Sequence, residues 1–137
     1  RVYACEYIFK NGRGLWPKLS VNYSNKVQFL YRIHKGAFEV NDQEGVNEKK
    51  YFGDHIHVPF ENMIFFGDGE TDVPTFNVLN KNNGKSICIY EDKNQKSIDI
   101  AKKLFSDGRI HHLVKNDYQE NSEVDVLVKE IIKSKSN

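Results

Sequence analysis

The sequence predicts an α/β domain in which helices cover a largely parallel sheet in three layers. In the second half of the chain, short apolar runs alternate with amphipathic stretches, and this alternation is typical of strand–helix–strand units around a parallel sheet. A dense acidic turn, residues 67–72, directly follows one of the apolar runs. The length of 137 residues fits one domain, so residues 1–137 are expected to form a single domain.

The first part of the chain predicts a hairpin followed by a helix. Residues 2–9 are rich in β-branched and aromatic side chains, and a glycine-containing turn follows at residues 11–14. We therefore expect residues 1–17 to form a hairpin-like excursion. Residues 25–33 have helical spacing, with Ser24 as the expected cap and Gly36 as the exit. The aromatic side chains of this part are expected to pack within the hairpin: Tyr3, Tyr7, Phe9 and Trp16.

The second part predicts three strands and three helices. The expected strands are residues 63–66, 86–90 and 110–114. The expected helices are residues 74–82, 97–105 and 124–132. Pro74 suits the first turn of the first of these helices, and Ser122 is a possible cap of the last. Residues 42–53 are polar and predict a surface connection.

The composition argues against several classes of partner. The net charge is +1, so no strong field favours nucleic acid or an acidic membrane. No apolar run approaches the ~18–20 residues of a membrane span. Cys5 and Cys88 each lie in an apolar run, which favours two core thiols in a reducing compartment over a disulfide framework. The sequence therefore predicts a cytoplasmic protein.

The acidic turn is the segment that suggests chemistry. Asp68 and Asp72 follow an apolar strand, with Glu70 between them, and ligands bind beyond the carboxyl ends of strands in open α/β sheets. Gly67 and Gly69 flank Asp68 and allow a close approach of the backbone to a ligand. Hard oxygen ligands on a short turn suit Mg²⁺, which takes one or two carboxylates and keeps waters or phosphate oxygens.

Other interpretations compete with a magnesium site. Counted from Asp68, the sixth and twelfth positions of an EF-hand would be Val73 and Leu79, and these exclude that motif. Alternatively, Asp72 could simply cap the following helix. His55 and His57 face one side of an extended segment, but no further ligands are evident, so they are expected to be ordinary loop histidines.

The segment Ile64-Phe65-Phe66-Gly67-Asp68-Gly69-Glu70-Thr71-Asp72-Val73-Pro74 resembles the fourth motif of the haloacid dehalogenase superfamily, a strand ending in Gly-Asp-x-x-x-Asp. The likeness extends over most of the chain from about residue 23. It implies a three-layer Rossmann-like core in which Asp68 and Asp72 position Mg²⁺. It also implies a catalytic lysine near the start of an upstream helix, a place that Lys26 fits, with Lys35 as the alternative.

The nucleophile of that family is missing. It is the first aspartate of an Asp-x-Asp motif, and no Asp-x-Asp occurs in this chain. The chain also begins at Arg1 rather than methionine. We therefore expect the C-terminal part of a haloacid dehalogenase-like hydrolase core, inactive on its own.

The resemblance implies that the complete protein is a Mg²⁺-dependent phosphatase, acting on a small phosphomonoester through an aspartyl-phosphate intermediate. The alternative is a non-catalytic binding or structural domain of the same fold. Besides the phosphorylated substrate, an open sheet edge is expected to pair with the missing N-terminal part or with another copy of the chain.

Overall fold

The computed structural model describes residues 3–22, 24–42, 44, 47 and 56–136. The chain divides into two compact units, Arg1–Phe60 and Glu61–Asn137, and each is described by itself. Most of the predicted surface connection at residues 42–53 lies outside the described residues. Within the described ranges, no helix is both long enough and apolar enough to cross a membrane.

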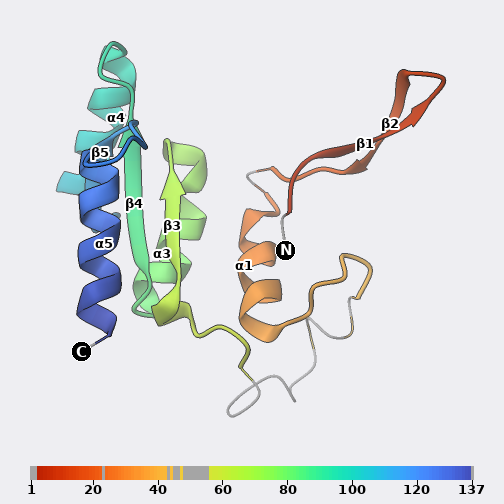
Figure 1. Cartoon of the computed structure of the whole chain (residues 1–137), viewed down its shortest axis with the longest axis horizontal. Helices are drawn as coiled ribbons and strands as arrows, with labels where there is room; N and C mark the ends of the chain where they lie inside the picture. Colours follow the sequence, from red (N-terminus) through yellow and green to blue (C-terminus); the bar gives the residue numbers. More distant parts are fainter. Residues whose placement is uncertain (1–2, 23, 43, 45–46, 48–55, 137) are drawn as a thin grey trace. The chain divides into compact units, whose positions relative to one another are not determined.

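The second unit contains a sheet of three parallel strands (Figure 1). The strands are β3 (Ile64–Gly67), β4 (Lys85–Tyr90) and β5 (His112–Lys115), in the order β3-β4-β5. In register, Gly67 pairs with Cys88, and Cys88 pairs with Leu113. The sequence-based prediction of an α/β protein with a parallel sheet is thus confirmed.

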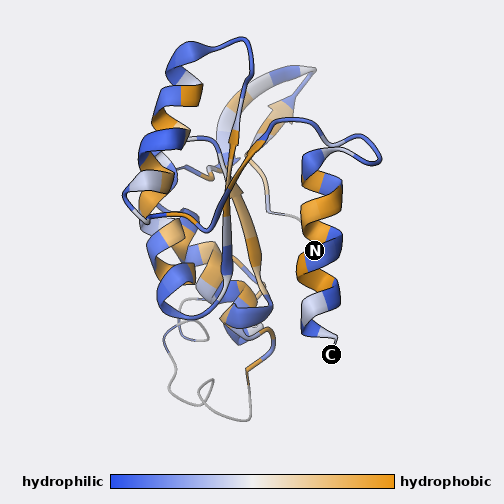
Figure 2. Cartoon of the chain, turned by 90° about the vertical axis from the view of Figure 1, so that its left-hand side faces the viewer, coloured by the Kyte–Doolittle hydropathy of each residue, from blue (hydrophilic) through white to orange (hydrophobic). Residues whose placement is uncertain are grey.

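Three helices flank this sheet on its two faces (Figure 2). They are α3 (Val73–Lys81), α4 (Gln95–Ser106) and α5 (Glu123–Lys135). One core joins α3 and α4 to the sheet through Phe76, Cys88, Ala101, Leu104 and Ile110. The other core joins α5 to the opposite face through Ile87, Val114, Val124 and Ile131. The central strand β4 is buried on both sides, which explains its continuous apolar sequence.

Side-chain caps fix the starts of two helices. Ser122 caps α5 by accepting a hydrogen bond from the Asp125 N–H, as the sequence predicts. Asn94 caps α4 by accepting from the Ser97 N–H, so this helix begins two residues before the predicted start. Pro74 lies in the first turn of α3, where its missing N–H costs nothing.

The first unit contains an antiparallel hairpin of β1 (Glu6–Lys10) and β2 (Arg13–Leu19). Its turn places Asn11 at φ 51° and Gly12 at φ 73°. Two expectations are wrong here. The hairpin does not bury its aromatic residues, because Tyr7, Phe9 and Trp16 are 57%, 67% and 72% exposed. Cys5 is not a core thiol either but is exposed beside the backbone of Val21.

The helix α1 (Lys26–Lys35) follows the hairpin. Asn25, not the predicted Ser24, occupies its N-cap, and the Ser24 hydroxyl instead donates to Asn22 Oδ1 over 2.6 Å. Gly36 ends the helix at φ 72°, in the left-handed conformation that glycine adopts without strain.

A buried arginine holds the segment after α1. The Arg32 side chain is fully buried and donates to four backbone carbonyls. The acceptors are the carbonyls of Ala37, Glu39, Val40 and Asp42. Hydrogen bonds from a charged donor are stronger than neutral ones, so this side chain determines the path of the segment.

A hydrogen-bond network ties β4 to the start of β5 at the amino end of the sheet. The Ser86 N–H donates to His111 Nδ1 over 3.2 Å, and the His111 N–H donates back to Ser86 Oγ over 3.1 Å. The Ser86 hydroxyl donates to Asn80 Oδ1 over 2.6 Å, which adds α3 to the network. His111 must keep Nδ1 unprotonated to accept the Ser86 N–H. Burial, followed by the positive charge of Lys85, lowers the pKa of His111 below its usual value.

We expect mild acid to weaken the second unit. The lowered pKa of His111 means that the unfolded chain binds a proton before the folded chain does, so stability is lost as the pH falls through about 6.5. His111→Asn should reduce this loss, as measured by urea unfolding at neutral pH and at about pH 5.5. The pKa of His112 is also lowered, mainly by burial, so His112 should account for part of the pH dependence that remains in His111→Asn. His57→Asn, in the other unit, is the matched control. An unchanged pH dependence in His111→Asn would contradict this explanation.

A candidate metal site at the carboxyl edge of the parallel sheet

Asp68 stands directly beyond the carboxyl end of β3, and its side chain is exposed. The turn continues as the short 3₁₀ helix η3 (Glu70–Asp72), which leads without a break into α3. The Asp72 N–H donates to the Gly69 carbonyl over 3.1 Å and closes the turn. Strand, turn and helix therefore place Asp68 where ligands bind in open α/β sheets.

Asp72 is buried beneath this turn, with 1% of its surface exposed. Its Oδ2 atom accepts a hydrogen bond from the Asp68 N–H over 3.0 Å. It occupies the N-cap position of α3, yet its side chain makes no capping hydrogen bond to that helix. The capping interpretation is therefore wrong, and Asp72 holds the turn that presents Asp68.

Gly67 makes room for the buried carboxylate. A Cβ atom at this position would lie 2.7 Å from Asp72 Oδ2 and 2.6 Å from the Phe76 ring. These separations are far below van der Waals contact, so a larger residue would displace the carboxylate or the ring. The glycine is required here by close packing rather than by a special backbone angle.

The acidic turn also affects the pKa of Cys88, which lies beside it on strand β4. Cys88 pairs with Gly67 in register and is fully buried. Burial raises the pKa of the Cys88 thiol to about 11, and the negative charges of Asp68 and Asp72 add to the effect. This thiol therefore stays protonated at neutral pH, as expected for a core cysteine and not for a nucleophile.

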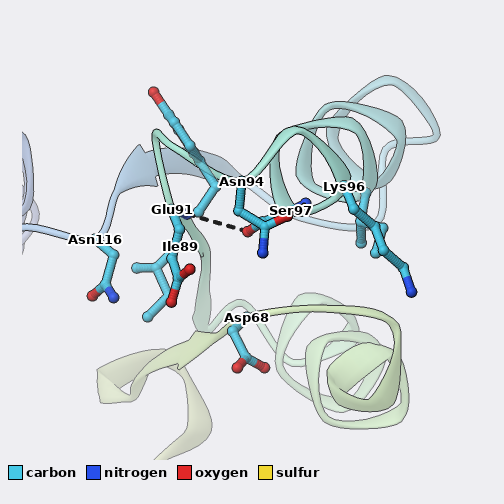
Figure 3. A pocket seen from close by; sticks show the side chains of 9 residues that line it. Asp68, Ile89, Glu91, Asn94, Lys96, Ser97 and Asn116 are labelled. Atoms are coloured by element: carbon cyan, nitrogen blue, oxygen red, sulfur yellow. Dashed lines mark hydrogen bonds between the residues drawn. The ribbon is translucent and has the colours of Figure 1, made fainter.

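A cavity of about 260 Å³ opens beside Asp68 at the carboxyl ends of the strands. Its lining comes from the ends of all three strands and the start of α4: Asp68, Ile89, Tyr90, Glu91, Asn94, Lys96, Ser97, Ile100 and Asn116. Ser97 Oγ accepts from the Glu91 N–H over 3.1 Å, which holds the strand end to the helix. In Figure 3, the Asp68 carboxylate points away from Asn94 and Ser97. The carboxylate is thus not engaged by the polar groups at the start of α4.

The two aspartates fit the chemistry of Mg²⁺ but make only part of a site. Mg²⁺ is usually bound through one or two carboxylates, with water or phosphate oxygens completing the shell. Asp68 offers an exposed carboxylate, and the buried Asp72 carboxylate accepts the backbone N–H of Asp68. Among the residues that the structure describes, no three His, Cys, Asp or Glu side chains are grouped to hold a metal. The described residues therefore do not gather a third carboxylate, thiolate or imidazole around Asp68.

The predicted lysines lie in the other unit. Lys26 is the first residue of α1 and is half-buried, and Lys35 is the last residue of the same helix and is buried. A cation is unfavourable at a helix N-terminus and favourable at the C-terminus. Helix electrostatics thus account for Lys35 but not for Lys26. The placement of Lys26 beside Asp68 stays a prediction.

The histidine pair gives no support for a second metal site. His55 lies outside the described residues. The His57 ring packs edge-on against Phe38, with ring centres 4.9 Å apart, and the backbone N–H of His57 donates to the His34 carbonyl. His57 therefore has a local structural role.

Several lining residues were missed at the sequence level. Glu91 directly follows β4, and Asn116 directly follows β5. Polar residues just after buried strands are a usable signal, because such ends meet along one edge of a parallel sheet. Applied to all three strands instead of one, that signal would have found them.

The chain has little detectable similarity to known proteins. No family model matches it, and no solved structure matches it. It is similar to an uncharacterized protein of Borreliella burgdorferi, with 28% identity over 109 residues that cover 76% of this chain and 34% of that protein. The chain spans about a third of the length of the relative it matches. The family resemblance of the acidic turn therefore stays a prediction.

We expect Gly67→Ala to destabilise the second unit by about 1–3 kcal/mol, because overpacking of a dense region costs this much. The free energy of unfolding measured in urea tests this. Gly69→Ala is the matched control in the same turn, since its new Cβ would meet only Ile100 Cγ2 at 4.0 Å. Equal stability losses in the two variants would contradict the proposed role of Gly67.

We expect a thiol reagent to distinguish the two cysteines of the folded chain. Cys5 is exposed, whereas Cys88 is buried with its pKa raised to about 11. At mildly alkaline pH, iodoacetamide should modify Cys5 rapidly and Cys88 only after unfolding. Peptide mass spectrometry reports the site. Rapid native modification of Cys88 would show that the carboxyl edge of the sheet is more open than the structure describes.

Proposed function

We propose that this chain is the C-terminal part of a Mg²⁺-dependent, haloacid dehalogenase-like phosphatase with a three-layer Rossmann-like core. Asp68, with Asp72 in support, would hold the metal, and Lys26 would screen the remaining negative charge. The observation that carries the proposal is the buried Asp72 carboxylate, which accepts the Asp68 N–H and leaves the Asp68 carboxylate open at the carboxyl end of β3. The supporting motif is the resemblance of residues 64–74.

The end of β3 is also a suitable place for a second reactive group. Among the described residues, β3 pairs with β4 alone, so its other edge is free. A parallel strand added there would lie about 4.8 Å from β3, and its carboxyl end would arrive beside Asp68. A strand added at β5 would lie beyond β4 and the cavity. The free edge of β3 thus favours a nucleophile-bearing strand at that side.

The charges of the reacting phosphoryl group and of the side chains assign a role to each residue. A transferring phosphoryl group carries negative charge, which its surroundings must neutralise. A bound Mg²⁺ would supply most of that neutralisation. Asp68 would provide the carboxylate ligand, while Asp72 would orient it through the turn backbone. An ammonium from Lys26 would screen charge on the phosphate and on the attacking carboxylate. Glu70 is exposed and is given no role.

A non-catalytic domain of the same fold is the second candidate. The specific observation in its favour is that no described group of three ligating side chains surrounds Asp68. Such a domain would keep the turn for its packing alone. Its Asp68 could then be replaced without any effect on metal binding.

We expect the chain to bind Mg²⁺ through Asp68. Mg²⁺ at about 100 times its Kd should stabilise the folded chain by about 2.7 kcal/mol. Asp68→Asn should abolish that gain, because it removes the charged ligand without changing the size of the side chain. Glu70→Gln is the matched control in the same turn and should keep the gain. Thermal unfolding with and without Mg²⁺ measures each effect.

Three outcomes would count against the proposal. A gain from Mg²⁺ that persists in Asp68→Asn would remove the metal assignment. Activity provides the second comparison, since a protein that contains this segment together with an upstream Asp-x-Asp strand should hydrolyse phosphomonoesters. Unchanged turnover in its Asp68→Asn variant would show that the activity does not depend on the Asp68 carboxylate, and absence of any phosphatase activity in that longer protein would favour the non-catalytic domain.

A further inference from the structure

The hairpin carries an unusual share of the exposed apolar surface. The large hydrophobic side chains exposed on the described chain number ten, and five of them lie on this hairpin. These five are Tyr7, Ile8, Phe9, Leu15 and Trp16. Every residue of β1 is exposed. Because a hairpin of two strands is only marginally stable in water by itself, this surface indicates a partner.

The two edges of the hairpin differ in their ability to accept a strand. The register of β1 against β2 shifts twice, and each shift leaves one extra residue, Lys18 or Leu15, on β2. Pro17 also removes one backbone donor from β2. Bulges and proline are the features that protect a strand edge from pairing. The strand β1 has neither, so its outer edge is the open one.

The sequence of β1, Glu6-Tyr7-Ile8-Phe9-Lys10, is complementary to itself in antiparallel register. If two copies align about a twofold axis at Ile8, Glu6 of each lies opposite Lys10 of the other. Tyr7 of each then lies opposite Phe9 of the other, and the two Ile8 side chains meet. Directly opposed charges and opposed aromatic side chains each stabilise antiparallel pairs. All contacts in this register are therefore favourable.

The same alignment extends contacts that the hairpin already makes. Ile8 pairs with Trp16 within the hairpin, so the dimer would contain a row Trp16–Ile8–Ile8–Trp16 across four strands. On the other face, Tyr7 pairs with Pro17 within the chain and would gain Phe9 of the second copy. Glu6, which bonds Lys18 at 3.0 Å, would lie between two lysines.

We propose that the outer edge of β1 pairs antiparallel with β1 of a second copy of this chain, forming a four-stranded sheet in the order β2-β1-β1-β2. A lipid surface fits less well, because the unpaired backbone groups along the outer edge of β1 would find no hydrogen-bond partners in hydrocarbon. The interface is isologous, as expected for a closed dimer. Two strands of five residues form a short interface, so we expect weak association that needs a high chain concentration.

A charge exchange tests the partner and the register together. Glu6→Lys and Lys10→Glu should each turn two attractive pairs into two repulsive ones and weaken self-association about tenfold. The double variant Glu6→Lys/Lys10→Glu restores opposite charges between the copies and should recover the association. Arg13→Glu, which changes the charge by the same amount on β2, is the matched control and should stay near wild type. Sedimentation equilibrium of the full chain measures each dissociation constant, and circular dichroism checks the fold.

A disulfide tests the twofold axis directly. Cα atoms of directly opposed residues in antiparallel strands lie about 4.5–5.5 Å apart, within the range of a disulfide. In a Cys5→Ser background, Ile8→Cys should give a covalent dimer on mild oxidation. Leu15→Cys, equally placed on the hairpin surface but on β2, should not.

The outcomes are decisive in both directions. Recovery in the double variant together with selective cross-linking through Ile8→Cys supports the proposed pairing. A chain that stays monomeric at all soluble concentrations overturns it and leaves the edge to a strand of a longer polypeptide. A double variant as weak as the single variants overturns the register, as would equal cross-linking through Leu15→Cys.

Discussion

One hydrogen bond determines the candidate site, the bond from the Asp68 N–H to the buried Asp72 carboxylate. A buried charge is costly unless it is well paired, so the turn can form only where Gly67 leaves space for the carboxylate. This bond lies between the end of β3 and the start of α3, beside the backbone bond from the Asp72 N–H to the Gly69 carbonyl. Together the two bonds hold the turn that presents the exposed Asp68 carboxylate.

The two units share a property despite their different architecture. Among the described residues, each unit has a sheet with two unpaired edges, and in each unit one of them, β3 in the parallel sheet and β1 in the hairpin, is suited to accept a further strand. The free edges differ in what surrounds them. The β3 edge adjoins an acidic turn, and a strand added there could bring a reactive group to Asp68, so this edge would serve catalysis. The β1 edge adjoins exposed aromatic residues and would serve association with another chain.

Much of the fold could be predicted because apolar runs of the second unit match its buried strands. The apolar run at residues 86–90 predicted that Ile87 and Cys88 lie in the core, and both side chains are fully buried. Ser122 and Gly36 were identified from local chemistry that needs no tertiary information. The burial of the hairpin residues was harder to predict, since the aromatic side chains of β1 and β2 resemble core residues whether or not a partner covers them. At the site, Asp68 and Asp72 were found from their spacing, but the different burial of the two acids depends on Phe76 and Gly67, which only the fold brings together.

The hydrogen bonds of Arg32 affect which substitutions the segment after α1 can tolerate. Its guanidinium holds the carbonyls of Ala37, Glu39, Val40 and Asp42, so it recognises main-chain oxygens rather than side chains. Every amino acid provides the same oxygen. The segment can thus exchange most of its side chains over evolution and keep its path, provided that the arginine remains. A single buried guanidinium would then fix the path of a segment whose exposed side chains are free to vary.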